Sequence, residues 1–207
     1  MMGNLVITIG RQFGSGGRQI GKKLAEELGI GYYDKEILNV AAKESGLCQT
    51  LFENHDEKPT GSFLYSLVMD TYSMGYNSGS YLDMPLNHKV FLAQFDAIKK
   101  LAERESCVIV GRCADYALEE FDNVFHVFIH ADKDYRIKNV MNYDSVNEAK
   151  AKDIVSKNDK QRASYYNYYT SKKWGDAKGY DLCLNSALLG VDGCVELIKR
   201  MIEIKNR

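Results

Sequence analysis

The chain has 207 residues, of which 45% are hydrophobic and 27% charged, and its formal net charge is −1. This composition is typical of a soluble globular domain. Because the net charge is close to zero, it gives no electrostatic reason to expect binding to nucleic acid or to a membrane surface. No apolar run approaches the roughly 20 residues that span a bilayer, and the glycine-rich stretch already begins at residue 10, which predicts a cytoplasmic protein without a signal peptide.

The first elements expected along the chain are a buried strand, a glycine loop and a helix. The apolar run at 5–9 is typical of such a strand, and apolar side chains at helical spacing continue to Leu28. Glycine lets the backbone approach a ligand closely, and a helix N-terminus offers unpaired N–H groups. We therefore expect a phosphate site, although a tight turn without a ligand would show the same pattern. Its candidate residues are Gly14, Ser15, Gly16, Gly17, Arg18 and Gln19.

The glycine loop departs from the P-loop pattern G-x-x-x-x-G-K-[ST]. With Gly17 as the glycine before the lysine, Arg18 takes the lysine position and Gln19 takes the hydroxyl position. Arg18 could then reach the phosphates or stay in solvent. The loop also fits the short-chain dehydrogenase pattern G-x-x-x-G-x-G, and Tyr168 and Lys172 form a Y-x-x-x-K. That alternative is weaker, because only two strands precede a long helical or irregular stretch.

A pair of carboxylates, Asp34 and Glu36, follows the short second strand expected at 31–33. A carboxylate at the end of a strand can hold a magnesium-bound water or orient an acceptor hydroxyl. Asp34 could instead cap the helix expected at 35–44. The sequence offers no direct protein ligand for a metal, so Mg²⁺ would meet Asp34 through water.

The stretch at 47–85 is less regular than the rest of the chain. It holds both prolines and many Ser, Gly, Asn and Tyr residues. Weak helical patterns occur at 49–55 and 62–74, and a loop is expected at 75–85. We interpret the stretch as a mobile helical subdomain.

The rest of the chain alternates strands with helices. Strands are expected at 107–110, 124–129 and 180–184. The alternation predicts an α/β fold with a parallel sheet of about five strands and helices on both faces. Ligands bind such sheets at the carboxyl ends of the strands, where the glycine loop, Asp34 and Arg112 fall. Helices are expected at 86–104, 114–119, 132–141 and 191–204.

Cationic side chains in the second half of the chain are candidates for phosphate binding. Arg112 directly follows a strand, and its guanidinium suits bidentate phosphate contact, although it could be a surface arginine. Lys157, Lys160 and Arg162 form a basic strip on a polar helix, which could equally be a solvated face. The tyrosines at 165–169 could stack a base or pack that helix down.

Three stretches of the chain resemble the cytidylate-kinase-like family of bacterial P-loop proteins, which is related to cytidylate kinase and other nucleoside-monophosphate kinases. The stretches are ITIGRQFGSGGRQIGKKLAEELGIGYYD, CVIVGRCADYAL and RASYYNYYTSKKWGDAKGYDLCLNS. The resemblance covers nearly the whole chain and is loosest at 47–85. It implies a three-layer P-loop kinase fold with a core and a lid, ATP as donor with Mg²⁺, and a small acceptor.

The resemblance also implies a division of one kinase-like domain, 1–207, into three parts. The core would comprise 1–46, 86–145 and 175–207. The acceptor-binding subdomain would be 47–85, and the lid 146–174.

Site residues carry over at matching positions. Gly14 to Arg18 match the phosphate loop, and Arg112 matches the arginine of D-G-R-D, which contacts the acceptor phosphate. Lys160 and Arg162 match the arginines of the lid pattern D-R-x-R, which cover the transferred phosphoryl group, and Asp34 lies near the acceptor. The resemblance thus implies Arg18, Asp34, Lys160 and Arg162 as catalytic residues, and Asp34 and Arg112 as acceptor-binding residues.

Departures from the family pattern limit what can be said of the substrate. Val110 and Cys113 stand where cytidylate kinases carry the two aspartates of D-G-R-D, so the sequence gives little support for cytidine specificity. We predict an ATP-dependent phosphotransferase acting on a nucleoside monophosphate. The alternatives are a nucleotide-binding sensor or regulator with little catalysis, a small-alcohol kinase and an NAD(P)-binding dehydrogenase. No nucleic-acid or membrane partner is expected, and a homodimer is an open option.

Overall fold

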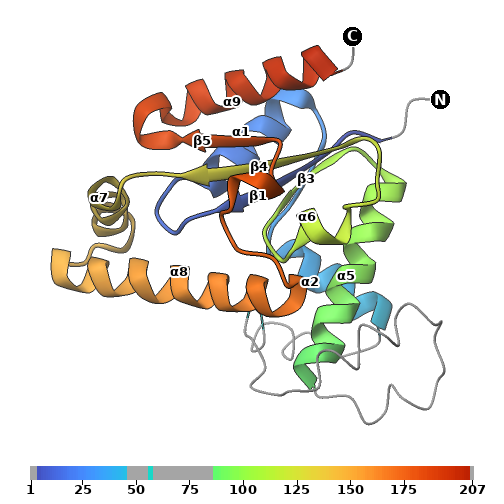
Figure 1. Cartoon of the computed structure of the whole chain (residues 1–207), viewed down its shortest axis with the longest axis horizontal. Helices are drawn as coiled ribbons and strands as arrows, with labels where there is room; N and C mark the ends of the chain where they lie inside the picture. Colours follow the sequence, from blue (N-terminus) through green and yellow to red (C-terminus); the bar gives the residue numbers. More distant parts are fainter. Residues whose placement is uncertain (1–3, 46–55, 58–85, 206–207) are drawn as a thin grey trace.

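The computed structural model describes residues 4–45, 56–57 and 86–205 (Figure 1). The helical patterns expected at 49–55 and 62–74, and the loop expected at 75–85, lie outside the described residues.

A five-stranded parallel sheet forms the centre of the molecule, in the order β2-β3-β1-β4-β5. β1 is the middle strand, and its Ile7 lies opposite Val108 on one side and Phe125 on the other. The prediction of a parallel α/β sheet is therefore confirmed. The strands are β1 Val6–Arg11, β2 Gly31–Tyr33, β3 Cys107–Val110, β4 Val124–His130 and β5 Leu182–Asn185.

Helices cover both faces of this sheet (Figure 1). α1 and α9 pack together on one face, whereas α5 and α6 lie on the other, with α2 against α5. The helices are α1 Gly17–Leu28, α2 Glu36–Ser45, α5 Leu86–Arg104, α6 Ala114–Ala117, α7 Lys133–Asp144, α8 Glu148–Thr170 and α9 Ser186–Lys205, with a 3-10 turn at Ala177–Gly179.

The last helix begins earlier than predicted. The sequence pattern places it at 191–204, but α9 starts at Ser186 and is kinked at Gly190, which has a φ of 67°. Glycine reaches this left-handed region without the steric penalty of a Cβ. The kink interrupts the helical periodicity, which is why the apolar pattern becomes visible only beyond it.

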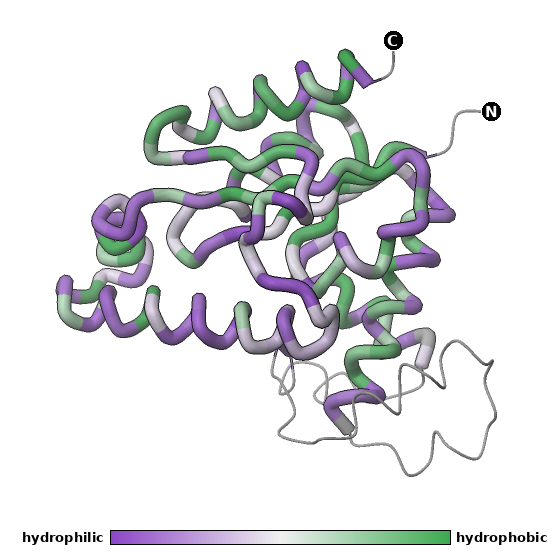
Figure 2. The backbone as a smooth tube through the Cα atoms, in the orientation of Figure 1, coloured by the Kyte–Doolittle hydropathy of each residue, from purple (hydrophilic) through white to green (hydrophobic). Residues whose placement is uncertain are grey.

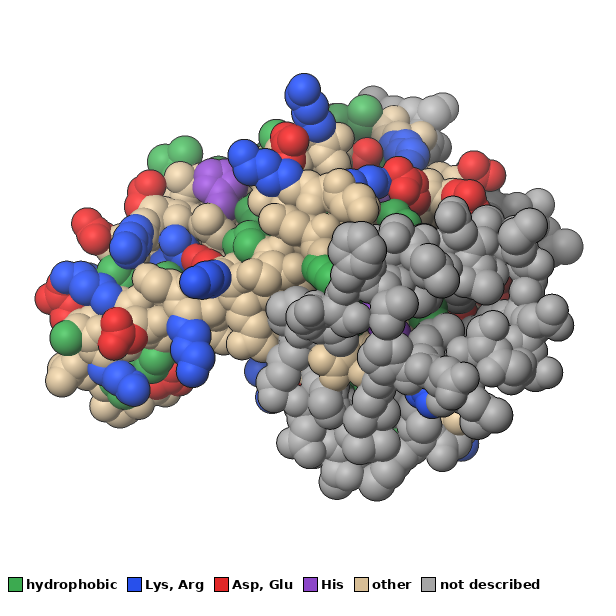
Figure 3. All heavy atoms as spheres, turned by 60° about the horizontal axis from the view of Figure 1, so that its bottom comes forward, with side chains coloured by type: hydrophobic (Ala, Val, Ile, Leu, Met, Phe, Trp, Pro, Cys, Tyr) green, Lys and Arg blue, Asp and Glu red, His purple; other side chains and the backbone are tan. Residues whose placement is uncertain are grey.

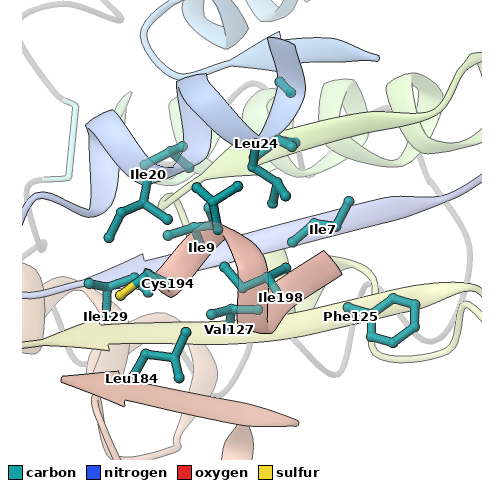
Figure 4. Close-up of a cluster of buried hydrophobic side chains, with 14 of the residues drawn as sticks. Ile7, Ile9, Ile20, Leu24, Phe125, Val127, Ile129, Leu184, Cys194 and Ile198 are labelled. Carbon is teal, nitrogen blue, oxygen red and sulfur yellow. The ribbon is translucent and has the colours of Figure 1, made fainter. Parts of the chain in front are cut away.

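Alternating side chains of the strands build two cores, one on each face. Ile7 and Ile9 of β1 are fully buried among residues of α1 and α9, including Leu24 and Ile198 (Figure 4). Val6 points the other way, into the core formed with α5 and α6. Each large aliphatic side chain buried in this way contributes about 1.5–3 kcal/mol to folding. The two cores fix the strand ends, and with them the loops that follow.

α8 is a long helix that is mainly hydrophilic along its length (Figure 2). Its last turns differ, because Tyr165, Tyr166 and Tyr169 are buried against α5 and α6. The ring of Tyr169 stacks on Phe91 at a centroid distance of 4.0 Å. These tyrosines therefore pack the helix down, which decides between the two roles that the sequence left open.

The described residues on the face shown in Figure 3 form no single strongly charged patch. Basic and acidic side chains are interspersed over the described part of the face in Figure 3. Among the described residues, every helix is too short or too polar to cross a bilayer.

Candidate active site at the carboxyl edge of the sheet

The glycine loop joins the end of β1 to the start of α1. Gly14 and Gly16 both have a φ of 77°, a conformation that favours glycine. A Cβ on Gly14 would lie 2.6 Å from the backbone oxygen of Arg136, so no larger residue fits there. The Ser15 hydroxyl donates to the carbonyls of Gln12 (2.8 Å) and Ile129 (3.2 Å). Ser15 thus turns its side chain toward the sheet and supports the loop from below.

An ion pair from two helices clamps the loop at Phe13. The Phe13 N–H donates to the Asp159 carboxylate of α8 at 2.8 Å, and Arg136 of α7 donates to the Phe13 carbonyl at 3.2 Å. Arg136 also pairs with Asp159, and its Nε donates to Ala131 O at 3.0 Å. The sequence does not predict this clamp, because Phe13, Arg136 and Asp159 are far apart along the chain and meet only in the folded structure.

Removing the charge of the clamp should destabilise the protein. Asp159→Asn keeps an acceptor for Phe13 N–H but leaves Arg136, whose side chain is 8% exposed, without its counter-ion. Since hydrogen bonds to charged groups contribute about 1.5–3 kcal/mol, we expect a loss of that size in the free energy of unfolding. Urea denaturation measures it. The exposed Asp153 on the same helix provides the control, Asp153→Asn, and equal effects of the two variants would argue against the clamp.

A cavity of about 660 Å³ opens beside the glycine loop. Its size suits a ligand as large as a nucleotide, since pockets for such molecules measure roughly 300–1,000 Å³. Its walls come from the loop, the ends of β2 and β3, and helices α7 and α8. The predicted residues that line it are Gly14, Gly16, Gly17, Arg18, Gln19, Asp34, Arg112 and Arg162.

Asp34 lies between two arginines at one side of the cavity. Arg18 Nε is 2.7 Å from Asp34 Oδ2, and Arg112 Nη1 is 3.3 Å from Asp34 Oδ1. Arg112 Nη1 also donates to the Asp34 backbone oxygen at 2.7 Å. The two arginines differ in environment, because the side chain of Arg18 is 63% exposed and that of Arg112 only 2%.

Two adjacent carboxylates, Asp56 and Glu57, occupy the cationic part of the cavity. Asp56 binds Arg112 in a bidentate manner, with Oδ1 2.9 Å from Nε and Oδ2 2.8 Å from Nη2. Glu57 Oε1 accepts from Arg11 Nη1 at 3.0 Å, and Glu57 Oε2 accepts from Arg162 Nε at 3.3 Å. Three largely buried guanidinium groups are thus held by two carboxylates, in a geometry that also suits phosphate oxygens.

These charges shift each other's pKa values. Burial would raise the pKa of Glu57, but the positive charges of Arg11, Arg162 and Arg112 outweigh it and lower the pKa from 4.5 to about 2. Burial and the positive charge of Arg11 lower the pKa of Arg162 to about 10. For Arg112, the carboxylates of Asp56 and Glu57 outweigh the effect of burial and raise the pKa. Glu57, Arg112 and Arg162 are therefore charged at neutral pH.

Other predicted residues lie farther from this cluster. Lys160 is exposed on α8 and is not among the residues lining the cavity. The Gln19 side chain binds the Tyr143 hydroxyl, with Nε2 2.8 Å away. Tyr168 of the alternative dehydrogenase pattern stacks on His88, and Lys172 pairs with Glu119. Among the described residues, His, Cys, Asp and Glu form no group of three or more that could hold a metal ion.

Sequence reasoning also missed Arg11, Asp56 and Glu57. Arg11 ends a strand and was not distinguished from its neighbours, although a charged residue at a carboxyl strand end was the available signal. Asp56 and Glu57 fall in the stretch whose pattern was least regular, and their partners lie 46 to 105 residues away in sequence.

Comparisons with known proteins identify similar sequences and folds. The sequence matches the cytidylate kinase-like family over residues 6–188. It is 32% identical to an uncharacterized protein from Eubacterium ventriosum ATCC 27560, with a TM-score of 0.70 and coverage of 97% of this chain and 99% of that one. Shikimate kinase from Bacteroides thetaiotaomicron is 13% identical, with a TM-score of 0.55 and coverage of 96% and 98%, respectively. No curated protein matches the sequence.

Proposed function

Because the chain belongs to the cytidylate kinase-like family and has the fold of P-loop kinases, we propose that it transfers a phosphoryl group from ATP to a nucleoside monophosphate. The observation that carries the proposal is the arginine cluster, Arg11, Arg112 and Arg162, in one cavity with the glycine loop. Phosphoryl transfer depends mainly on positioning and charge neutralisation. Two phosphorylated substrates would supply the anions for so many cations, whereas a neutral alcohol acceptor would not.

We assign the donor and acceptor to different sides of the cavity. The glycine loop and the N-terminus of α1 would hold the donor phosphates, since unpaired helix N–H groups favour anions. Arg112 would bind the acceptor phosphate in place of the Asp56 carboxylate, and Arg162 would cover the transferred group. Asp34 would lie beside the acceptor. For Arg18 and Lys160, the catalytic roles rest on the family resemblance.

Magnesium fits this arrangement as a companion of the nucleotide. Mg²⁺ prefers oxygen ligands, usually keeps several waters and binds substrate phosphates with one or two carboxylates. Asp34, just after β2, and Asp144, at the end of α7, are among the aspartates that line the cavity beside the glycine loop. Asp34 is the proposed partner of a magnesium-bound water. When bound, the cation would neutralise phosphate charge.

Turnover with a panel of acceptors tests the proposal. The purified protein is incubated with ATP, Mg²⁺ and either nucleoside monophosphates or small alcohols, and ADP and the phosphorylated product are measured. We expect ADP to form in the presence of a nucleoside monophosphate. Product from an alcohol alone would contradict the proposed acceptor class.

A second candidate function is a nucleotide-binding sensor or regulator. It is favoured by Asp56 and Glu57, which already form ion pairs with the three arginines of the cavity, and by the absence of the lysine from the glycine loop. In the same experiment, tight ATP binding without turnover of any acceptor would support this candidate.

A further inference from the structure

The side chain of Arg11 occupies a space that two glycines leave open. A Cβ on Gly17 would lie 2.6 Å from Arg11 Cβ, and a Cβ on Gly111 would lie 2.0 Å from Arg11 Nη1. Real Cβ atoms do not approach other atoms this closely, so a larger residue at either position would displace the arginine. The Arg11 guanidinium lines the cavity, and the side chain is only 11% exposed. The fold is thus shaped around Arg11 at this point.

The structure also favours a different register for the P-loop pattern. In strand–G-x-x-x-x-G-K-[ST]–helix, the first glycine follows the strand and the lysine lies at the helix. β1 ends at Arg11, α1 begins at Gly17, and Gly16 caps the helix with a φ of 77°. With Gly16 as the second glycine, Arg11 takes the first glycine position and Gly17 the lysine position. Glycine and cation have exchanged places, and the two residues lie against each other.

We propose that Arg11 is the phosphate-binding cation of this loop and acts from the space beside Gly17, where a lysine side chain would otherwise begin. The identity of its ligand as the polyphosphate of ATP rests on the proposed function. Arg11 already holds an anion, because its Nη1 is 3.0 Å from Glu57 Oε1. Arg162 holds the other oxygen of the same carboxylate at 3.3 Å. Two guanidinium groups therefore converge on one anion position, and an arginine fork binds phosphate oxygens in the same way.

Arg18 is the competing cation, and its surroundings differ. It lies in the first turn of α1, its side chain is 63% exposed, and its Nε pairs with Asp34 at 2.7 Å. This contact points Arg18 toward the end of β2. Arg11 instead lies beside the loop itself, packed against the first residue of α1.

Binding of inorganic tripolyphosphate and of MgATP, measured by calorimetry, tests the role of Arg11. Tripolyphosphate presents the donor's phosphates without the base. We expect Arg11→Ala to weaken its binding by about 10- to 150-fold, the size of a lost charged hydrogen bond, and Arg18→Ala to weaken it less. Arg200→Ala, on the exposed side of α9, is the matched control. Unchanged binding by Arg11→Ala, or a larger loss with Arg18→Ala, would overturn the inference.

An exchange of the two residues provides a second test that does not depend on a loss alone. Arg11→Gly should lose binding, and Gly17→Lys should lose it as well, because the new side chain collides with Arg11. The double variant Arg11→Gly/Gly17→Lys removes the collision and should bind tripolyphosphate at least 10-fold more tightly than Arg11→Gly. Thermal denaturation verifies that each variant is folded. A folded double variant that binds tripolyphosphate no better than Arg11→Gly contradicts the exchange. If the double variant does not fold, Arg11→Lys, which keeps the charge, is tested in its place.

The two proposals fail in different ways. Turnover of a nucleoside monophosphate tests the proposed function, whereas Arg11-dependent tripolyphosphate binding tests the role of Arg11. A protein that binds tripolyphosphate through Arg11 but phosphorylates no acceptor retains the second and loses the first. If Arg11→Ala leaves turnover unchanged, the proposed function is retained and the role of Arg11 is lost. If the wild-type protein binds neither tripolyphosphate nor MgATP, both proposals are overturned.

Discussion

Replacing Arg112 by alanine should weaken binding of the nucleoside monophosphate by about 10- to 150-fold, the equivalent of one lost guanidinium–phosphate contact, while MgATP binding changes much less. The reason is the position of this guanidinium. It contacts Asp34, at the acceptor side, and presents two parallel N–H donors that now hold both oxygens of Asp56. A phosphate in the place of that carboxylate would lose both bonds in the variant.

Separate calorimetric titrations with each ligand measure this difference. Arg112→Ala also leaves Asp34 and Asp56 without their buried partner, which costs about 3–5 kcal/mol of stability in such pairs. Arg112→Lys keeps the charge but not the bidentate geometry, and should therefore fold better while binding the acceptor weakly. Arg104→Ala, an exposed arginine at the end of α5, serves as the control. Equal losses for donor and acceptor would contradict the acceptor-side role of Arg112.

Acidification should weaken the fold through Glu57. Its pKa is lowered in the folded protein, from 4.5 to about 2, so its stabilising contribution is fully present above pH 4.5 and is lost as the pH falls toward 2. A shift of this size corresponds to roughly 3 kcal/mol. Glu57→Gln should therefore reduce the free energy of unfolding strongly at pH 7 and only slightly near pH 2. Urea denaturation across this range measures the difference.

The same substitution should have the opposite effect on ligand binding. Arg11 and Arg162 share the Glu57 carboxylate as their anion. Glu57→Gln removes this charge, so a phosphate ligand no longer competes with a carboxylate for the two arginines. Glu57→Gln should therefore bind tripolyphosphate more tightly than the wild type while being less stable in its absence. Glu119→Gln, at the exposed pair with Lys172, is the control for removing an acidic charge. A destabilised variant with unchanged affinity would show that Glu57 does not compete with phosphate.

The fold could be predicted from local patterns because the chain obeys them. The apolar runs of β1, β3 and β4 are buried on both faces, which is the pattern that parallel strands require. The predicted start of α9 was wrong because the positive φ of Gly190 divides the helix. The apolar residues before the kink therefore do not follow the helical spacing of those after it. In each case the outcome follows from backbone geometry over a few residues.

The candidate site was less predictable, because its contacts connect distant residues. Asp34, Arg112 and Arg162, which line the cavity, could be proposed from their places at strand ends and in a motif. Glu57 could not be found, since its significance arises only where Arg11 and Arg162 meet. The register of the glycine loop likewise depends on the space between Gly17 and its neighbours, which no one-dimensional pattern records.

The central position of β1 has a consequence for how the protein is made. β1 leaves the ribosome before the other strands of the described sheet, where its partners are β3 and β4, and one acceptor of the Ser15 hydroxyl is the carbonyl of Ile129, 114 residues later. At synthesis rates of about 5–20 residues per second, this stretch takes roughly 6–23 s to appear. Contacts this distant in sequence also form slowly. The nascent β1 strand must therefore wait for these partners, and the glycine loop gains its contact with β4 only after residue 129 has been translated.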